Sequence, residues 1–327
     1  MKIQELRDKM KSANREDIEK IVAELYKMIP KSRKESEADP IIEDIIAHKA
    51  SAATPKSAIV DFAALKLEIE TFISRVDDNL YYVPNRIIPK NKRSKWRFEV
   101  KNFVKKIRTI PADGENGEES ARLLRELYKR LCYGCGYYIF PSEDPFNSIG
   151  IRQPDFYEML VYRTFANGFT DEKLKNMLED ATLVHLDRNS LHIELEAIFS
   201  SALSTIDLKY KVIGFIMEYV EKYEIQLKVE PKKYYSDRRY LLERHIEEMC
   251  NTMLVIAISL QEPVEAIKYY WTHVTDTDKE ITLYRILDIV GIFGDNALWI
   301  KVYEEALQRK IKPRESLQNT YKNLTSV

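Results

Sequence analysis

Residues 56–76 read KSAIVDFAALKLEIETFISRV, and this stretch decides the predicted fold. Its apolar side chains recur at intervals of three and four residues, which places them on one face of an α-helix. The expected buried side of this helix consists of Ile59, Phe62, Ala63, Ile69, Phe72, Ile73 and Val76. An earlier helix, expected to begin at Asn14 and to end at Pro30, follows the same pattern.

Helical spacing continues through the rest of the chain. It returns over residues 119–131, 155–165, 170–179, 190–204, 208–223, 236–260, 263–271, 276–293 and 295–309. Pro154 and Pro263 stand at expected helix starts, and Asp276 and Asp295 are expected caps. The connections are short, as between antiparallel neighbours. We predict an all-α, multi-helical array of stacked antiparallel helix pairs, an α-solenoid or HEAT-like superhelix with little or no sheet.

Only residues 137–145 are expected to be extended. The low count of nine glycines and the 31% of charged residues both favour helices with solvated faces. Three cysteines cannot form a disulfide framework, and no apolar run of about 18 residues provides a membrane span. Charges near Met1 exclude the apolar core of a secretory signal. We therefore expect a cytoplasmic protein without a membrane partner.

The chain is expected to have three parts. Residues 1–80 form an N-terminal helical region, and residues 81–117 form a basic segment punctuated by proline. This segment ends in a flexible acidic loop, DGENG, at residues 113–117. Residues 118–327 form a domain that resembles a helical repeat in its run of helices, although no repeat of fixed length occurs.

The segment 81–111 has a strong chemical bias. The chain holds 51 basic and 52 acidic residues, and this segment contains ten Lys or Arg and only one acid, Glu99. Tyr81, Tyr82, Trp96, Phe98 and Phe103 are interleaved with these charges. Clustered cations bind phosphate backbones, and neighbouring aromatic rings stack on unpaired bases.

The segment therefore predicts a surface for nucleic acid or another polyanion. Its expected contacts are Arg93, Lys95, Trp96, Arg97, Lys101, Lys105 and Lys106. A second basic patch is expected to add Lys232, Lys233, Arg238 and Arg239. The alternative is a solvated basic face that packs against the acidic remainder of the chain or against an acidic protein. Trp96 and Phe103 are seven residues apart, so they could also share a buried face.

A second candidate site is the loop-rich block PSEDPFNSIGIRQPDFYEML at residues 141–160. Function concentrates on ordered loops, so a pocket lined by Arg152, Asp155 and Tyr157 is expected if the protein is an enzyme. The alternative interpretation is that the block is a rigid connector between helices. No phosphate-binding loop, dinucleotide fingerprint or nucleophile elbow occurs in the sequence.

Cys132 and Cys135 form a C-x-x-C pair, which suits thiol redox chemistry or half of a zinc site. No second pair completes a zinc site, and a helix rather than a strand is expected before the motif. Two small residues in a packed helix end are the simpler interpretation. No metal or other cofactor is expected.

The leading hypothesis is a helical scaffold without catalytic activity that binds nucleic acid or an acidic protein through the basic segment. Two alternatives stay open. One is an enzyme with a pocket near residues 141–160, and the other is a protein–protein interaction or oligomeric structural module.

Overall fold

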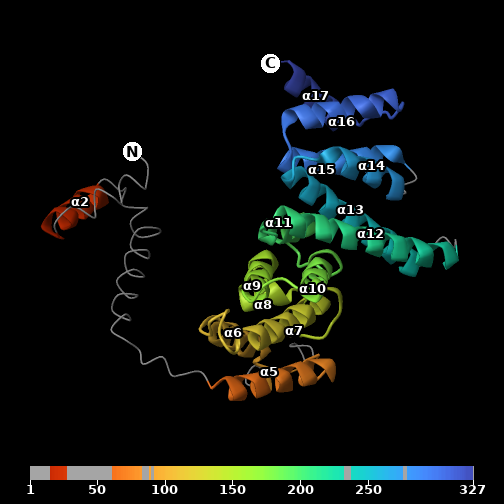
Figure 1. Ribbon diagram of the computed structural model, residues 1–327. Coiled ribbons are helices and arrows are strands. Elements are labelled where there is room, and N and C mark those ends of the chain that lie inside the picture. Colours follow the sequence, from red (N-terminus) through yellow and green to blue (C-terminus); the bar gives the residue numbers. More distant parts are fainter. Residues whose placement is uncertain are drawn as a thin grey trace. The chain divides into compact units, whose positions relative to one another are not determined.

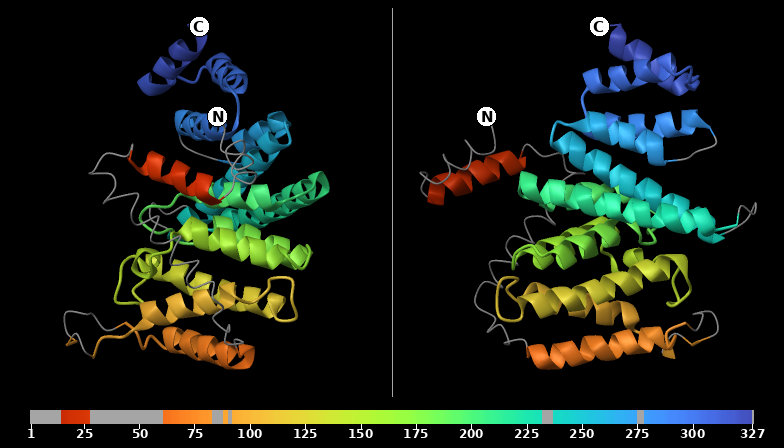
Figure 2. Two further views of the ribbon diagram at one scale, coloured as in Figure 1. Left: turned by 90° about the vertical axis from the view of Figure 1, so that its left-hand side faces the viewer. Right: turned by 45° about the vertical axis from the view of Figure 1, so that its right-hand side comes forward.

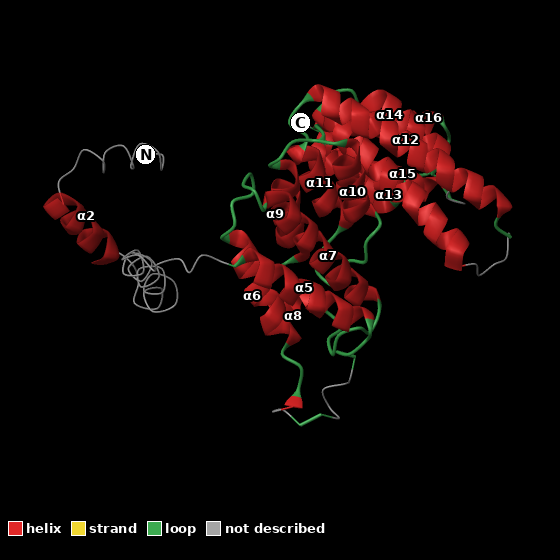
Figure 3. Ribbon diagram, turned by 60° about the horizontal axis from the view of Figure 1, so that its bottom comes forward, coloured by secondary structure: helices red, strands yellow, loops and turns green. Residues whose placement is uncertain are grey.

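A computed structural model describes residues 15–27, 61–82, 88–89, 92–231, 237–274 and 278–326. All regular structure in this part of the chain is helical, and no strand occurs in it (Figure 3). The prediction of an all-α protein is confirmed. None of the helices in the same residues has the length and apolar character needed to cross a membrane.

The chain divides into two compact units, Met1–Val60 and Asp61–Val327. In the first unit the structure describes α2 (Arg15–Lys27), on which Ile21, Val22 and Leu25 are exposed. The expected helix start at Asn14 and stop at Pro30 lie outside the described residues.

The second unit holds the remaining described helices. They are α5 (Phe62–Asp77), α6 (Trp96–Arg108), α7 (Gly117–Gly136), α8 (Pro145–Ile149), α9 (Gln153–Phe165), α10 (Asp171–Thr182), α11 (His192–Ala202), α12 (Ile206–Val229), α13 (Asp237–Ser259), α14 (Pro263–His273), α15 (Lys279–Phe293), α16 (Asn296–Gln308) and α17 (Glu315–Thr325).

Helices of the second unit contact mainly helices that are close to them in the chain. Helix α7 packs on α5 and α9, α13 packs on α11, α12 and α14, and α16 packs on α15 and α17. The unit therefore runs in chain order from α5 to α17 (Figures 1 and 2). A superhelix of regular helix pairs remains a prediction.

The boundaries expected after residues 80 and 117 remain predictions. Helices α5, α6 and α7 pack against one another, and α6 and α7 also contact α8. Helix α6 of the basic segment is thus part of one packed group of helices. The chain divides after Val60.

Several helix starts follow the expected chemistry. The carboxylate of Asp295 accepts a hydrogen bond of 2.7 Å from the backbone N–H of Leu298, as an N-cap does. Pro154 and Pro263 lie in the first turns of α9 and α14. Asp276 lies outside the described residues, and Asp278 caps α15 instead. Residues 137–144, expected to be extended, form a loop that leads into the short helix α8.

The buried face of α5 differs in part from the expected one. Leu65, Ile69, Phe72 and Val76 are buried, whereas Ala63 is exposed. Phe72 contacts Phe103 of α6 and Phe140 of the loop 137–144, with ring centroids 5.6 and 6.5 Å apart. This aromatic cluster joins α5, α6 and the loop in one core.

A buried arginine fixes the far end of α6. Arg163 of α9 donates hydrogen bonds to the carbonyl oxygens of Ile107 and Ile110 at 2.9 and 2.8 Å, and to the hydroxyl of Ser120 at 2.8 Å. The carbonyl of Ile107 lies in the last turn of α6 and also accepts from the backbone N–H of Ile110 at 3.1 Å, and the carbonyl of Ile110 lies just beyond the helix. Arg163 therefore ties α9 to the end of α6 and the beginning of α7.

Replacing Arg163 with Met should lower the free energy of unfolding by about 2–4 kcal/mol, because three buried acceptors lose the hydrogen bond from Arg163 and the carbonyl of Ile107 keeps only that from Ile110. Chemical denaturation measures the effect. Arg152→Met is the matched control, since its side chain is 59% exposed and a change within about 1 kcal/mol is expected. Equal losses for the two variants would contradict a supporting role for Arg163.

Candidate nucleic-acid interface

The amphipathic character of α6 decides where its charges lie. The helix reads WRFEVKNFVKKIR and buries Trp96, Val100, Phe103, Val104 and Ile107. These residues are three and four apart, so they form one stripe along the helix. Trp96 is 3% exposed, and its ring stacks on Phe140 with centroids 4.3 Å apart. Trp96 is therefore a core residue and not the base-stacking contact that was predicted.

Four of the five cations of α6 lie on its exposed side, next to the buried stripe. Arg97, Lys101, Lys105 and Arg108 are exposed, and we call these four the cationic face of α6. Successive members are three or four residues apart, which is about 5–6 Å along the helix axis. Lys92 and Lys95 are exposed in the turn that precedes the helix.

The cationic face is not neutralised by the described residues. Within the described ranges, no carboxylate lies within 4.0 Å of any of its four charged groups. The ammonium of Lys101 lies over Gly150, where a side-chain carbon would be 3.5 Å from it. Gly150 ends α8, and the end of a helix carries partial negative charge. Lys101 thus lies beside the end of α8, and no described carboxylate pairs with its charge.

Two other predicted contacts are engaged within the fold. Lys106 forms an ion pair of 2.8 Å with Glu68 of α5. Arg93 is half-buried and donates a hydrogen bond of 3.2 Å to the carbonyl oxygen of Ile88. Both residues are therefore poorer phosphate ligands than the cationic face.

The second basic patch carries little free charge. Lys232 and Lys233 lie outside the described residues. Arg238 pairs with Glu230 at 3.0 Å, and Arg239 pairs with Glu243 at 3.0 Å. These acids lie close in the sequence, as the diluted charge of this region already indicated.

The residues predicted to line a pocket do not line one together, although Arg152 and Asp155 form an ion pair of 3.9 Å on the surface. Tyr157 is fully buried and donates a hydrogen bond of 2.7 Å to the carbonyl oxygen of Met177. Arg152 and Asp155 are exposed, and Arg152 pairs with Glu194 of α11 at 2.9 Å. Tyr157 therefore stabilises the packing of α9 on α10 and lines no cleft.

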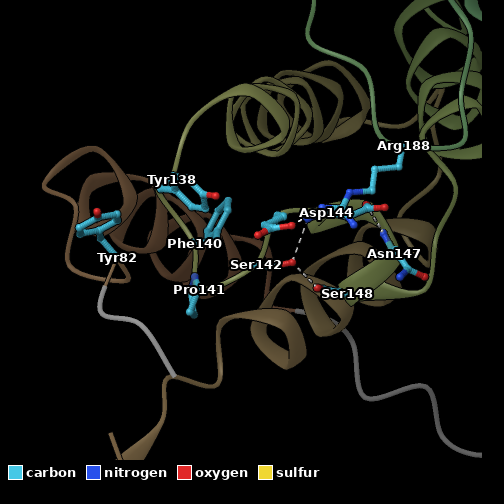
Figure 4. Close-up of a pocket in the computed structure, with 10 residues that line it drawn as sticks. Tyr82, Tyr138, Phe140, Pro141, Ser142, Asp144, Asn147, Ser148 and Arg188 are labelled. Atoms are coloured by element: carbon cyan, nitrogen blue, oxygen red, sulfur yellow. Dashed lines mark hydrogen bonds and ion pairs between the residues drawn. The ribbon is translucent and has the colours of Figure 1, made fainter. Parts of the chain in front are cut away.

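A pocket does lie within the same block, at its other end. Its volume is about 690 Å³. It is lined by Tyr82, Tyr138, Phe140, Pro141, Ser142, Glu143, Asp144, Asn147, Ser148 and Arg188 (Figure 4). The hydroxyls of Ser142 and Ser148 are 2.7 Å apart, and Asp144 caps α8 by accepting from the N–H of Asn147 at 2.9 Å. No histidine or lysine among the described lining residues could activate either serine as a nucleophile.

The C-x-x-C motif lies in the last turns of α7. Cys132 is buried, and burial raises the pKa of its thiol well above the usual value. Burial also raises the pKa of Cys135 to about 12. Redox and nucleophilic cysteines need a thiolate. Packing is therefore the role that the geometry gives to this pair, and no group of three metal-binding side chains is found among the described residues.

A buried group of carboxylates lies between α11 and α13, and no sequence pattern indicated it. Glu196 is fully buried, and neither of its carboxylate oxygens has a hydrogen-bond partner among the described atoms. Glu248 of α13 accepts from the amide of Asn251 at 3.0 Å and lies 3.6 Å from Arg244. Burial and the neighbouring Glu248 together raise the pKa of Glu196 well above the ordinary carboxyl value.

The cysteine assignment predicts low thiol reactivity. In the native protein at about pH 7.5, Cys132 should not react with Ellman's reagent, and Cys135 should react on the order of a thousandfold more slowly than a free thiol. All thiols should react at once in guanidinium chloride. Two fast thiols in the native protein would support the redox interpretation.

The raised pKa of Glu196 makes the stability of the folded protein depend on pH. A carboxyl whose pKa is raised in the folded state contributes stability at low pH that is lost as pH rises toward that pKa. Glu196→Gln should therefore raise the Tm by about 2–5 °C at about pH 8 and change it little at about pH 5. Glu218→Gln, at an exposed carboxylate, is the control. A loss of stability at about pH 8 would contradict a protonated Glu196.

Comparison with known proteins adds no assignment. No protein-family model matches the chain, and no curated protein or solved structure matches it.

Proposed function

We propose that this protein binds nucleic acid through the cationic face of α6, with backbone phosphates as the ligands. The observation that carries the proposal is the row Arg97, Lys101, Lys105 and Arg108, which are exposed and form no ion pair within the described residues. Arg108 also donates a hydrogen bond of 3.2 Å to the sulfur of Met159. A row of uncompensated cations raises the local concentration of any polyanion. Docking of phosphates on it releases counterions, which makes the binding favourable and dependent on salt.

The surroundings of the cationic face favour nucleic acid over an acidic protein. Phe98 is 56% exposed on the same helix, and the guanidinium of Arg97 lies 4.8 Å from the centre of its ring. An exposed aromatic ring beside cations is a stacking surface for bases. An acidic peptide gains little from such a ring, because its carboxylates need only the charges.

The positive charge is concentrated on α6 and is not spread over the chain. The chain as a whole has a formal net charge of −1, although α6 carries five basic residues and one acid. The rest of the molecule therefore repels a polyanion, and this repulsion orients the polyanion toward α6. We expect a single oriented contact and not a general coating of the surface.

The proposal predicts how binding depends on salt. Fluorescence anisotropy with short RNA and DNA strands should show micromolar or tighter affinity at about 50 mM salt and a marked loss at about 200 mM. The triple variant Arg97→Ala, Lys101→Ala, Lys105→Ala should bind at least about tenfold more weakly. Its salt slope should be smaller by about 2–3, since each of the three phosphate contacts contributes about 0.7–0.9.

Lys106→Ala is the matched control, because Lys106 is already paired with Glu68. It should bind within about twofold of the wild type. Circular dichroism should show unchanged helix content in both variants. Absence of binding at low salt would refute the proposal. Equal competition by polyglutamate would assign the cationic face to acidic proteins instead.

A further inference from the structure

We infer that the pocket of about 690 Å³ beside α8 receives an unpaired base of the strand bound on α6. The inference rests on the proposed function and adds a site to it. It makes single-stranded nucleic acid the preferred ligand.

The walls of the pocket differ from one end to the other. Tyr82, Tyr138 and Phe140 form an aromatic end, and Ser142, Asp144, Asn147 and Ser148 lie toward the other end, below Arg188 (Figure 4). A nucleobase has the matching form, with two apolar faces and a polar edge. Base-specific sites in single-strand binding proteins combine an aromatic stacking partner with hydrogen-bonding groups at that edge.

The aromatic end is open to a ligand. Tyr138 is 63% exposed and Tyr82 is 51% exposed, so neither ring is occupied by the core. Phe140 is buried and forms the back of the pocket. Tyr133 and Tyr137 continue the aromatic surface outside the pocket, where their half-exposed rings stack with centroids 4.4 Å apart. Several exposed tyrosines at one end of α7 suit successive bases of a strand.

The polar end suits a neutral, hydrogen-bonding group and not a phosphate. Glu143 forms an ion pair with Arg188, which neutralises both charges. Among the described lining residues, Asp144 is a charge without an ion-pair partner in the described part of the chain, and a carboxylate repels phosphate. The side-chain amide of Asn147 is exposed and makes no hydrogen bond within the described part of the chain. It can therefore donate to and accept from a base edge.

The pocket and the cationic face are built on the same elements, α6 and α8. The ring of Phe140 stacks on Trp96, the first residue of α6, and Arg97 follows Trp96 in the sequence. On the other side, Asn147 and Ser148 of α8 line the pocket, while Lys101 lies over Gly150 at the end of α8. A five-residue helix is only about 7.5 Å long. A strand whose phosphates lie on Lys101 and Arg97 can therefore place a neighbouring base in the pocket.

This geometry separates single strands from duplexes. A base within a duplex is stacked and paired, so it enters the pocket only after the cost of unstacking. An unpaired base enters without that cost. The cationic face binds both forms through their phosphates, and the pocket adds affinity for the single strand alone.

The test compares three probes by fluorescence anisotropy: a single strand of about twelve nucleotides, its duplex, and an abasic strand with the same phosphates. The wild type should bind the single strand roughly five- to a hundredfold more tightly than the abasic strand. Tyr138→Leu should weaken binding of the base-bearing strand severalfold and leave the affinity for the abasic strand and the salt slope unchanged. Tyr138→Phe, which keeps the ring, should retain the wild-type affinity for both strands.

Tyr162→Leu is the control, because Tyr162 is exposed on α9 and lines no part of this pocket. It should bind every probe as the wild type does. Equal affinity of the wild type for base-bearing and abasic strands would overturn the pocket assignment and leave the phosphate contacts standing. Failure of all three probes to bind would instead refute the proposed function.

Discussion

Burial of one face of α6 is the constraint on which the rest of the structure depends. The helix has five apolar side chains that must leave water and five cations that cannot be buried without partners. Packing the apolar stripe against α5, α7 and α8 therefore forces most of the cations outward. Lys106 lies at the border of the two faces, where Glu68 of α5 reaches it. The same event thus builds the core and exposes the charge.

The neighbouring elements hold this arrangement in place at both ends. Arg163 satisfies the carbonyls at the end of α6, and the stack of Trp96 on Phe140 fixes its beginning. Gln153 supports the pocket from α9. Its side-chain oxygen accepts from the backbone N–H of Asp187 at 2.7 Å, and the backbone N–H of Gln153 donates to the carboxylate of Asp187 at 3.2 Å. Arg188 follows directly, so this pair positions Arg188 to meet Glu143.

The positions of the helices were predicted from the sequence more accurately than the residues that each helix buries. Apolar spacing and local caps such as Asp295 and Pro263 act within a few residues, so they can be read along the chain. Periodicity does not show which residue at the edge of an apolar stripe is buried. On α5, Ala63 was expected to be buried but is exposed, and Leu65 is buried instead. Trp96 lay in a segment rich in cations, but its spacing from Phe103 already indicated a buried face.

The candidate site was predicted in part. The cationic face follows from the composition of one helix, and the structure adds which of its lysines are paired. The pocket could not be predicted, because Tyr82, Tyr138 and Arg188 come from three separate stretches of the chain. Tyr157, chosen for its place in a loop-rich block, turned out to follow the first turn of α9 and to face the core. Contacts across such distances depend on packing, for which a single sequence gives no signal.

The most direct test of the central claim is the reactivity of individual lysines toward an acetylating reagent, measured by mass spectrometry with and without an oligonucleotide. Lys101 and Lys105 should react rapidly in the free protein and become severalfold protected in the complex. Lys106 should react slowly in both states because Glu68 holds its ammonium. Slow labelling of Lys101 and Lys105 in the free protein, or protection elsewhere but not on α6, would contradict the account.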